Sequence, residues 1–263
     1  MKYIATISGG KDSTAMCDLL LKKGFPVDYI VFNDTTDEFD EMYEYLDKVE
    51  EYFLTRYNKK ITRLKPVKNY DDYIFRVLSR GENVGSVAGL PNGVQGFCEW
   101  RRDAKIRPFE RWIKAEKIGE HKIYMGITLD EAHRTDRNSN FLYPLIDDFM
   151  LSEENCKAYL INQEMENPLY KHFSRTGCRK CQFQSDRDFF NIWKHYPKVW
   201  QEFADYESKV RELKMNGASV VSESWFTDHR TCLDMETKFI KTDKQGSLFD
   251  FSNEPLKDCF CKI

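Results

Sequence analysis

The residues with the clearest chemistry form one run near the start of the chain: Ser8, Gly9, Gly10, Lys11, Asp12 and Ser13. The glycines let the backbone pass close to an anion, and the first amides of a following helix point at that anion. Lys11 adds a mobile cation, and the serines add hydroxyl donors. Asp12 suits Mg²⁺, which takes carboxylate and phosphate oxygens. The run predicts a phosphate-binding turn with Lys11 and Asp12 as candidate catalytic residues.

Three cysteines form a second group of candidate reactive residues. Cys98 precedes four basic residues in the segment 101–107, and nearby cations favour the thiolate, which attacks electrophiles or ligates metal. Cys178 and Cys181 form a CxxC motif around two more basic residues. The cysteines predict a metal or redox site, and zinc held by four thiolates is one form of it. The cations also favour a nucleic-acid partner. They are Arg101, Arg102, Lys105, Arg107, Arg175, Arg179 and Lys180.

Two further segments carry polar residues that suit a nucleotide. Asp34 follows a run of β-forming residues, at the place where an α/β fold reads a sugar hydroxyl or an adenine edge. The alternative is an acidic helix N-cap at Thr36 or Asp37. Gly126 ends another such run, and Arg134 after it is a bidentate ligand for phosphate or sulfate that Glu131 would orient. The alternative there is a charged helix start.

The elements that must position these residues alternate along the chain. Strands are expected at 3–7, 28–33, 60–66 and 122–126, and helices at 14–23, 38–57 and 105–117. This alternation predicts a parallel sheet with right-handed crossovers, whose ligand lies beyond the carboxyl ends of the strands. The expected fold is therefore α/β, a Rossmann-like parallel sheet of about five strands with a helical C-terminal portion.

The chain is expected to divide into a nucleotide-binding α/β domain at 1–150 and a helical region at 151–263. The second region carries the CxxC motif, an aromatic stripe at 189–206 that predicts core packing, and a flexible tail. The 263 residues include no signal peptide and no apolar run long enough to span a membrane, so a cytoplasmic protein is expected. The eight cysteines are then candidates for metal or redox chemistry rather than for disulfides.

On these residues the chain resembles the PAPS reductase-like family of the adenine nucleotide α-hydrolase (PP-loop ATPase) superfamily, of phage or bacterial type. The resemblance rests on the run 8–13, the segments 98–108 and 126–134, and the order of Asn-Pro-Leu-Tyr followed by the Gly-Cys that opens the CxxC motif. It implies a HUP-type fold and ATP with Mg²⁺ at the run 8–13. It also implies a 4Fe–4S cluster, or alternatively zinc, on Cys98, Cys178 and Cys181. A fourth thiolate would come from Cys232, Cys259 or Cys261, or one iron would stay open.

The resemblance implies an ATP-pyrophosphatase that adenylylates a substrate for sulfur insertion, with a base of tRNA or DNA as substrate and a separate sulfur donor protein. One alternative is a thiol- or iron–sulfur-dependent reductase of adenylyl sulfate or its 3′-phosphate. The terminal Glu-Cys-Gly signature of those reductases is absent here. A second alternative is a non-catalytic nucleotide-binding module associated with DNA.

The tail contains a short pattern that is typical of peptides that dock on bacterial sliding clamps. Gln245 is followed by Gly246, Ser247, Leu248 and Phe249, which fits Gln-x-x-Leu-Phe. A sliding clamp is therefore a further predicted partner. The simpler interpretation is that the two apolar side chains pack on the protein's own surface, because patterns of this length recur by chance.

Overall fold

The structure is a computed structural model that describes residues 1–92, 98–135 and 138–245 of the chain. These residues form two compact units that interleave along the sequence. Of the described residues, the first unit contains Met1–Val67 and Arg102–Cys178, and the second contains Lys68–Arg101 and residues 179–245. The expected division near residue 150 stays a prediction.

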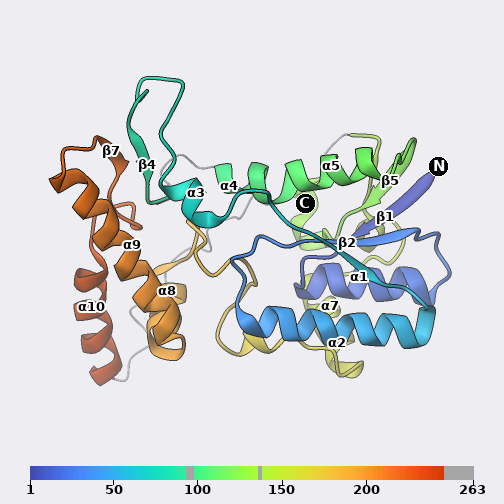
Figure 1. Ribbon diagram of the computed structural model, residues 1–263. Coiled ribbons are helices and arrows are strands. Elements are labelled where there is room, and N and C mark those ends of the chain that lie inside the picture. The colour runs from blue at the N-terminus through green and yellow to red at the C-terminus, as the bar shows by residue number, and fades with distance from the viewer. Residues whose placement is uncertain (93–97, 136–137, 246–263) are drawn as a thin grey trace. The chain divides into compact units, whose positions relative to one another are not determined.

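A five-stranded parallel sheet forms the centre of the first unit (Figure 1). Its order is β3-β2-β1-β5-β6, so the first strand of the chain is the middle one. Every pair of neighbours is parallel, which confirms the expected Rossmann-like α/β sheet. The strands are β1 (Lys2–Thr6), β2 (Tyr29–Asn33), β3 (Ile61–Leu64), β5 (His121–Tyr124) and β6 (Phe141–Leu142).

Four of these strands lie where β-forming runs were predicted, and β6 was not predicted. It has two residues, which pair with Ile123 and Tyr124. A two-residue strand cannot show an alternating pattern, so the sequence carries no signal for it. The sheet core is apolar on both faces, as expected for parallel strands covered by helices. Ala5, Ile30 and Phe32 are buried on one face. The cluster on the other face includes Ile4, Val31, Leu64, Phe109, Ile123, Met125 and Ile127.

Helices cover this sheet (Figure 1). The helix α1 starts at Lys11, three residues before the predicted start, because it begins immediately after the glycine turn. It packs beside α7. The α-helices of the first unit are α1 (Lys11–Lys22), α2 (Asp40–Tyr57), α5 (Arg107–Ala115), α6 (Pro144–Asp147) and α7 (Glu153–Asn162). The π-helix η1 (Arg102–Ile106) and the 3-10 helices η2 (Leu129–Arg134) and η3 (Pro168–Lys171) complete it.

The second unit is largely helical and has an aromatic core. A two-stranded parallel sheet joins β4 (Val87–Gly89) to β7 (Val220–Ser222). Phe203 and Phe239 are fully buried among other rings, so the aromatic stripe is core packing as predicted. The helices are α3 (Tyr70–Ile74), α4 (Glu99–Arg101), α8 (Asp186–His195), α9 (Pro197–Met215) and α10 (Cys232–Gln245).

Two predictions depend on residues beyond α10. Leu248 and Phe249 of the clamp-binding pattern, like Cys259 and Cys261, lie outside the described residues. Within the described ranges, none of the helices has both the length and the apolar composition of a membrane span.

Candidate nucleotide-binding site

Two glycines fix the turn that joins β1 to α1. Gly9 has φ +77°, and a Cβ there would lie 2.2 Å from Sδ of Met42. At Gly126, just after β5, a Cβ would lie 2.7 Å from Cα of Ser13. Gly9 suits its position because a side chain is strained at this φ, and Gly126 suits its position because an added carbon would overlap the backbone of Ser13. The end of β5 and the first turn of α1 therefore meet. Gly126 lies beside the predicted phosphate-binding turn.

The serine hydroxyls close the turn on itself. The hydroxyls of Ser8 and Ser13 share a hydrogen bond of 2.9 Å, and the Ser8 N–H donates to Oγ of Ser13 at 3.0 Å. The Ser13 hydroxyl also lies 3.2 Å from the carbonyl oxygen of Gly10. These side chains hold the shape of the turn before any anion arrives.

The two predicted catalytic residues lie in the first turn of α1 and contact each other. The ammonium of Lys11 lies 3.1 Å from Oδ2 of Asp12 and 2.6 Å from Oε2 of Glu153. Burial alone would lower the pKa of Lys11, but the two carboxylates outweigh it and raise that pKa above its usual value. Burial raises the pKa of Asp12 to about 6, although Lys11 opposes the shift.

One oxygen of Asp12 suits a cation. Oδ1 is buried and has no hydrogen-bond partner in the described part of the chain, and the Cys156 thiol lies near the same carboxylate. Mg²⁺ is usually bound by one or two carboxylates together with phosphate oxygens, so a single unsatisfied carboxylate oxygen beside a phosphate turn fits it.

A later segment, residues 167–176, lies over the turn. The backbone N–H of Lys11 donates to the hydroxyl of Tyr170 at 2.9 Å, and the Asn167 amide donates to the carbonyl oxygen of Gly9 at 2.8 Å. A Cβ at Gly10 would lie 3.1 Å from Oγ1 of Thr176. Sequence reasoning missed these contacts, since it used Asn-Pro-Leu-Tyr only as part of the resemblance.

The segment after β5 is tied to the same place. Arg134 forms an ion pair with Glu131, the orienting partner that the sequence suggested. Asp130 accepts a hydrogen bond from the N–H of Glu153 at 2.7 Å. The η2 segment, the start of α7 and the first turn of α1 are therefore connected through Glu153.

Asp34 is buried at the end of β2, where its carboxylate holds the following turn. Its Oδ1 accepts hydrogen bonds from the hydroxyl of Tyr43 and the N–H of Thr36, each at 2.8 Å. The ammonium of the exposed Lys65 lies 3.6 Å from Oδ2. The N-cap alternative is wrong, because α2 begins at Asp40 and Phe39 is its N-cap residue.

The Cys178 thiol lies in a buried acidic cluster at the same end of β2. It donates to Oε1 of Glu38 at 3.7 Å, and the Thr35 hydroxyl donates to the same oxygen at 2.7 Å. Burial raises the pKa of Glu38 and the pKa of Cys178, and Lys105 opposes both shifts. The Cys178 thiol is therefore held in its protonated form.

The convergence of Cys98, Cys178 and Cys181 stays a prediction, because Cys178 belongs to the first unit and the other two belong to the second. Among the described residues, no group of three or more histidine, cysteine or acidic side chains is arranged to hold a metal ion. Three thiols suit a soft metal, but the donor set fits only if the Cys178 proton leaves, since metals bind the thiolate.

Several cations of the proposed nucleic-acid surface have acidic partners. Arg102 and Arg107 lie 3.2 and 2.7 Å from the carboxylate of Asp103. Arg179 and Lys180 lie 3.0 and 2.7 Å from that of Glu202, and the Lys180 side chain is only 2% exposed. These ion pairs offset part of the positive charge that was expected to attract a nucleic acid. A nucleic-acid partner stays a prediction.

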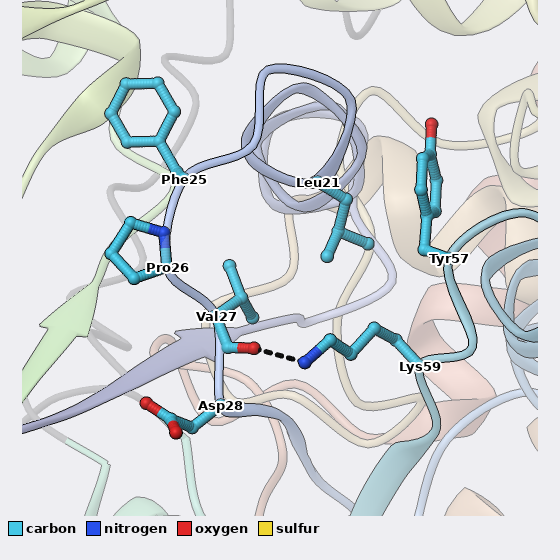
Figure 2. A pocket seen from close by; sticks show the side chains of 7 residues that line it. All are labelled: Leu21, Phe25, Pro26, Val27, Asp28, Tyr57 and Lys59. Atoms are coloured by element: carbon cyan, nitrogen blue, oxygen red, sulfur yellow. Dashed lines mark hydrogen bonds between the residues drawn. The ribbon is translucent and has the colours of Figure 1, made fainter.

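A pocket elsewhere in the first unit contains none of the predicted site residues. It lies beside the last turns of α1 and α2 and the residues that enter β2, where the Lys59 ammonium donates to the carbonyl oxygen of Val27 at 2.5 Å (Figure 2). This is the amino end of β2, opposite to the end at which Asp34 lies. Its lining is Leu21, Phe25, Pro26, Val27, Asp28, Tyr57 and Lys59.

Comparison with known proteins identifies relatives of the chain. It is 27% identical over 223 residues to an uncharacterized protein of Methanocaldococcus jannaschii, a match that covers 80% of this chain and 41% of the relative. The chain thus spans less than half of that protein's length. A crystal structure of phosphoadenylyl-sulfate reductase from Candida auris, in complex with phosphate, matches with a TM-score of 0.46 and 17% identity. That match covers 68% of this chain and 81% of the reductase.

A model of the phosphoadenosine phosphosulfate reductase domain matches residues 2–184. This range contains the glycine turn, Asp34, the η2 segment and all three cysteines of the predicted metal site. Because the match spans well over half of the sequence, the chain belongs to the phosphoadenosine phosphosulfate reductase domain family, whose members are PP-loop enzymes that use nucleotides.

Proposed function

We propose that this protein is an ATP-pyrophosphatase that adenylylates its substrate and then exchanges the activated oxygen for sulfur. The observation that carries the proposal is the first turn of α1, where Lys11, a buried Asp12 oxygen without a nitrogen or oxygen donor among the described residues, and the glycine turn come together. Helix N-termini bind phosphates through their first amides and dipole, and a phosphate oxygen would take the place of the Tyr170 hydroxyl at the N–H of Lys11. A cation and a carboxylate beside those amides suit a magnesium polyphosphate.

In the first step, Lys11, Asp12 and the backbone amides of the turn have different roles. A substrate oxygen attacks the α-phosphorus of ATP, a bond from that phosphorus to the bridging oxygen breaks, and pyrophosphate leaves with the negative charge. Lys11 and the amides of the turn stabilise this charge, and fixed groups of this kind supply much of an enzyme's rate. Bound Mg²⁺ would neutralise further charge on the departing phosphates, with Asp12 as its ligand.

The second step would use the cysteines. A sulfur nucleophile attacks the activated carbon, and AMP leaves with the former substrate oxygen. We assign Cys98, Cys178 and Cys181 to hold an iron–sulfur cluster or zinc beside this reaction. The sulfur comes from a donor protein, and a base of tRNA or DNA is the proposed substrate. Asp34, Gly126 and Arg134 are proposed to surround the nucleotide.

Reduction of adenylyl sulfate or its 3′-phosphate is the second candidate function. It is favoured by the family model, which is named for that activity. Cys178 would take part only after losing its proton, and a second thiol would be needed, so that the two thiols become a disulfide as sulfite and the adenosine phosphate leave. The two functions differ in their products, since the first releases pyrophosphate from ATP and the second releases sulfite from a sulfonucleotide.

The first measurement is the release of pyrophosphate and of sulfite by the parent protein. The second is ATP binding by the parent and by two lysine variants. Lys11→Ala is expected to weaken ATP binding about 10-fold or more, the effect of losing a charged hydrogen bond. Lys23→Ala, which removes an exposed cation at the end of the same helix, should bind ATP like the parent. Equal affinities in all three proteins by calorimetry would overturn the proposed site. Sulfite release without pyrophosphate release would replace the first function by the second.

A further inference from the structure

Glu153, the first residue of α7, contacts a catalytic candidate from another part of the chain. Its Oε2 lies 2.6 Å from the ammonium of Lys11, although the two residues are 142 positions apart. The Lys11 side chain is 13% exposed and that of Glu153 is 42% exposed. Solvent therefore reaches the contact, and its energy is modest compared with that of a buried ion pair.

The contact matters because Lys11 has two carboxylate partners. Asp12 lies 3.1 Å from the same ammonium, so one positive charge faces two negative ones. Two of the three N–H donors of the ammonium are taken by carboxylates, so the several oxygens of a polyphosphate compete with these carboxylates for the cation. Asp12 is the next residue in the same helical turn and moves with Lys11. Glu153 belongs to a different helix and is the partner that can be exchanged.

The position of Glu153 is fixed by its surroundings. Ser152 and Asn155 form a capping box that sets the start of α7. The N–H of Glu153 donates to Oδ2 of Asp130 at 2.7 Å, which ties this start to η2. The carboxylate is therefore held at a defined point beside Lys11.

We propose that Glu153 is a positioning residue. It pairs with the Lys11 ammonium in the free protein, and only a strongly charged polyphosphate replaces it there. The inference rests on the proposed function, because it needs phosphates to bind at the first turn of α1. It assigns Glu153 a role in selecting the anion. A weak anion leaves the Glu153–Lys11 pair intact, whereas pyrophosphate or the phosphates of ATP replace Glu153 at the ammonium.

Calorimetry with inorganic pyrophosphate, at fixed pH and salt, tests the inference. Glu153→Gln keeps the shape of the side chain and removes its charge, so it should bind pyrophosphate about three- to fivefold more tightly, the size of an exposed ion pair. Glu154→Gln is the matched control, since Glu154 is an exposed acidic residue in the same turn. It should bind pyrophosphate like the parent.

A double variant separates release of Lys11 from general electrostatic repulsion. If Glu153 acts through Lys11, then Lys11→Ala and Lys11→Ala/Glu153→Gln should bind pyrophosphate equally weakly. A gain that persists without Lys11 overturns the inference, and so does a Glu153→Gln protein that binds no more tightly than the parent. A parent that binds no pyrophosphate overturns the proposed function and the inference with it.

Discussion

At the scale of single residues, Asp12 has a carboxylate whose charge the fold disfavours. Burial raises its pKa to about 6, above the value of about 4 in an unfolded chain. The folded state therefore binds a proton more tightly than the unfolded state does. The stability of the protein is expected to fall as the pH rises from about 4 to 6, and the full loss persists above that window.

Asp12→Asn should remove this loss. We expect the variant to be more stable than the parent at pH 7.5, by on the order of 1–2 kcal/mol, and nearly equal to it at pH 4. Chemical denaturation at both pH values measures the difference. The variant should also lose the added stability that Mg²⁺ and ATP give the parent.

Asp28 provides the opposite case. Lys2 overcomes the effect of burial and lowers the pKa of Asp28. Asp28→Asn should therefore destabilise the protein at pH 7.5. If Asp12→Asn destabilised the protein at that pH, the claim that the charged Asp12 carboxylate costs folding free energy would be wrong.

Contacts of single side chains were the hardest feature to predict from the sequence. Lys11 and Asp12 were predicted because a glycine turn before a helix has a specific chemical meaning. Their partners Glu153 and Tyr170 were missed. They are 142 and 159 positions away from Lys11, and neither belongs to a local pattern with a chemical meaning. Single contacts of this kind are set by how the helices pack.

At the scale of elements, Gly126 couples the end of β5 to the start of α1. A Cβ at this position would lie 2.7 Å from Cα and 2.9 Å from N of Ser13, so the backbone of α1 would have to move. Gly126→Ala is expected to lower the free energy of unfolding by about 1–3 kcal/mol, as overpacking does, and to weaken ATP binding. Denaturation and calorimetry measure the two effects.

Gly119→Ala is the matched control, since a Cβ there meets no atom within 4 Å. It should leave both quantities near the parent values. Equal behaviour of the two variants would show that the contact between β5 and α1 is unimportant for the site.

Most elements of the first unit could be predicted, for physical reasons. The apolar β-forming runs at β1, β2, β3 and β5 are long enough to show their pattern, and a parallel sheet follows from their alternation with helices. Boundaries were less certain. The start of α2 was expected at Glu38 and lies at Asp40, because acidic residues near a helix start are common on either side of the cap.

At the scale of the whole molecule, the predicted metal site needs residues of both units. Cys178 would have to lose the proton that it shares with Glu38, so metal binding should release a proton and tighten as the pH rises. Anaerobic purification followed by iron, sulfide and zinc analysis measures occupancy. We expect Cys98→Ser, Cys178→Ser and Cys181→Ser each to lower the metal content of the protein.

Cys17→Ala is the control for these variants, because Cys17 is fully buried within α1 and belongs to no proposed ligand set. It should keep the parent's metal content. Full metal content in all three serine variants would contradict the predicted site.

The order of strands also has a consequence for how the protein is made. β1 leaves the ribosome before the other four strands of its sheet, yet it is the middle strand, and its neighbour β5 begins only at His121. At roughly 5–20 residues per second, translation leaves one edge of β1 without its partner for on the order of ten seconds. Open strand edges are where nascent chains aggregate, so chaperone demand in the cell should concentrate on this interval of synthesis.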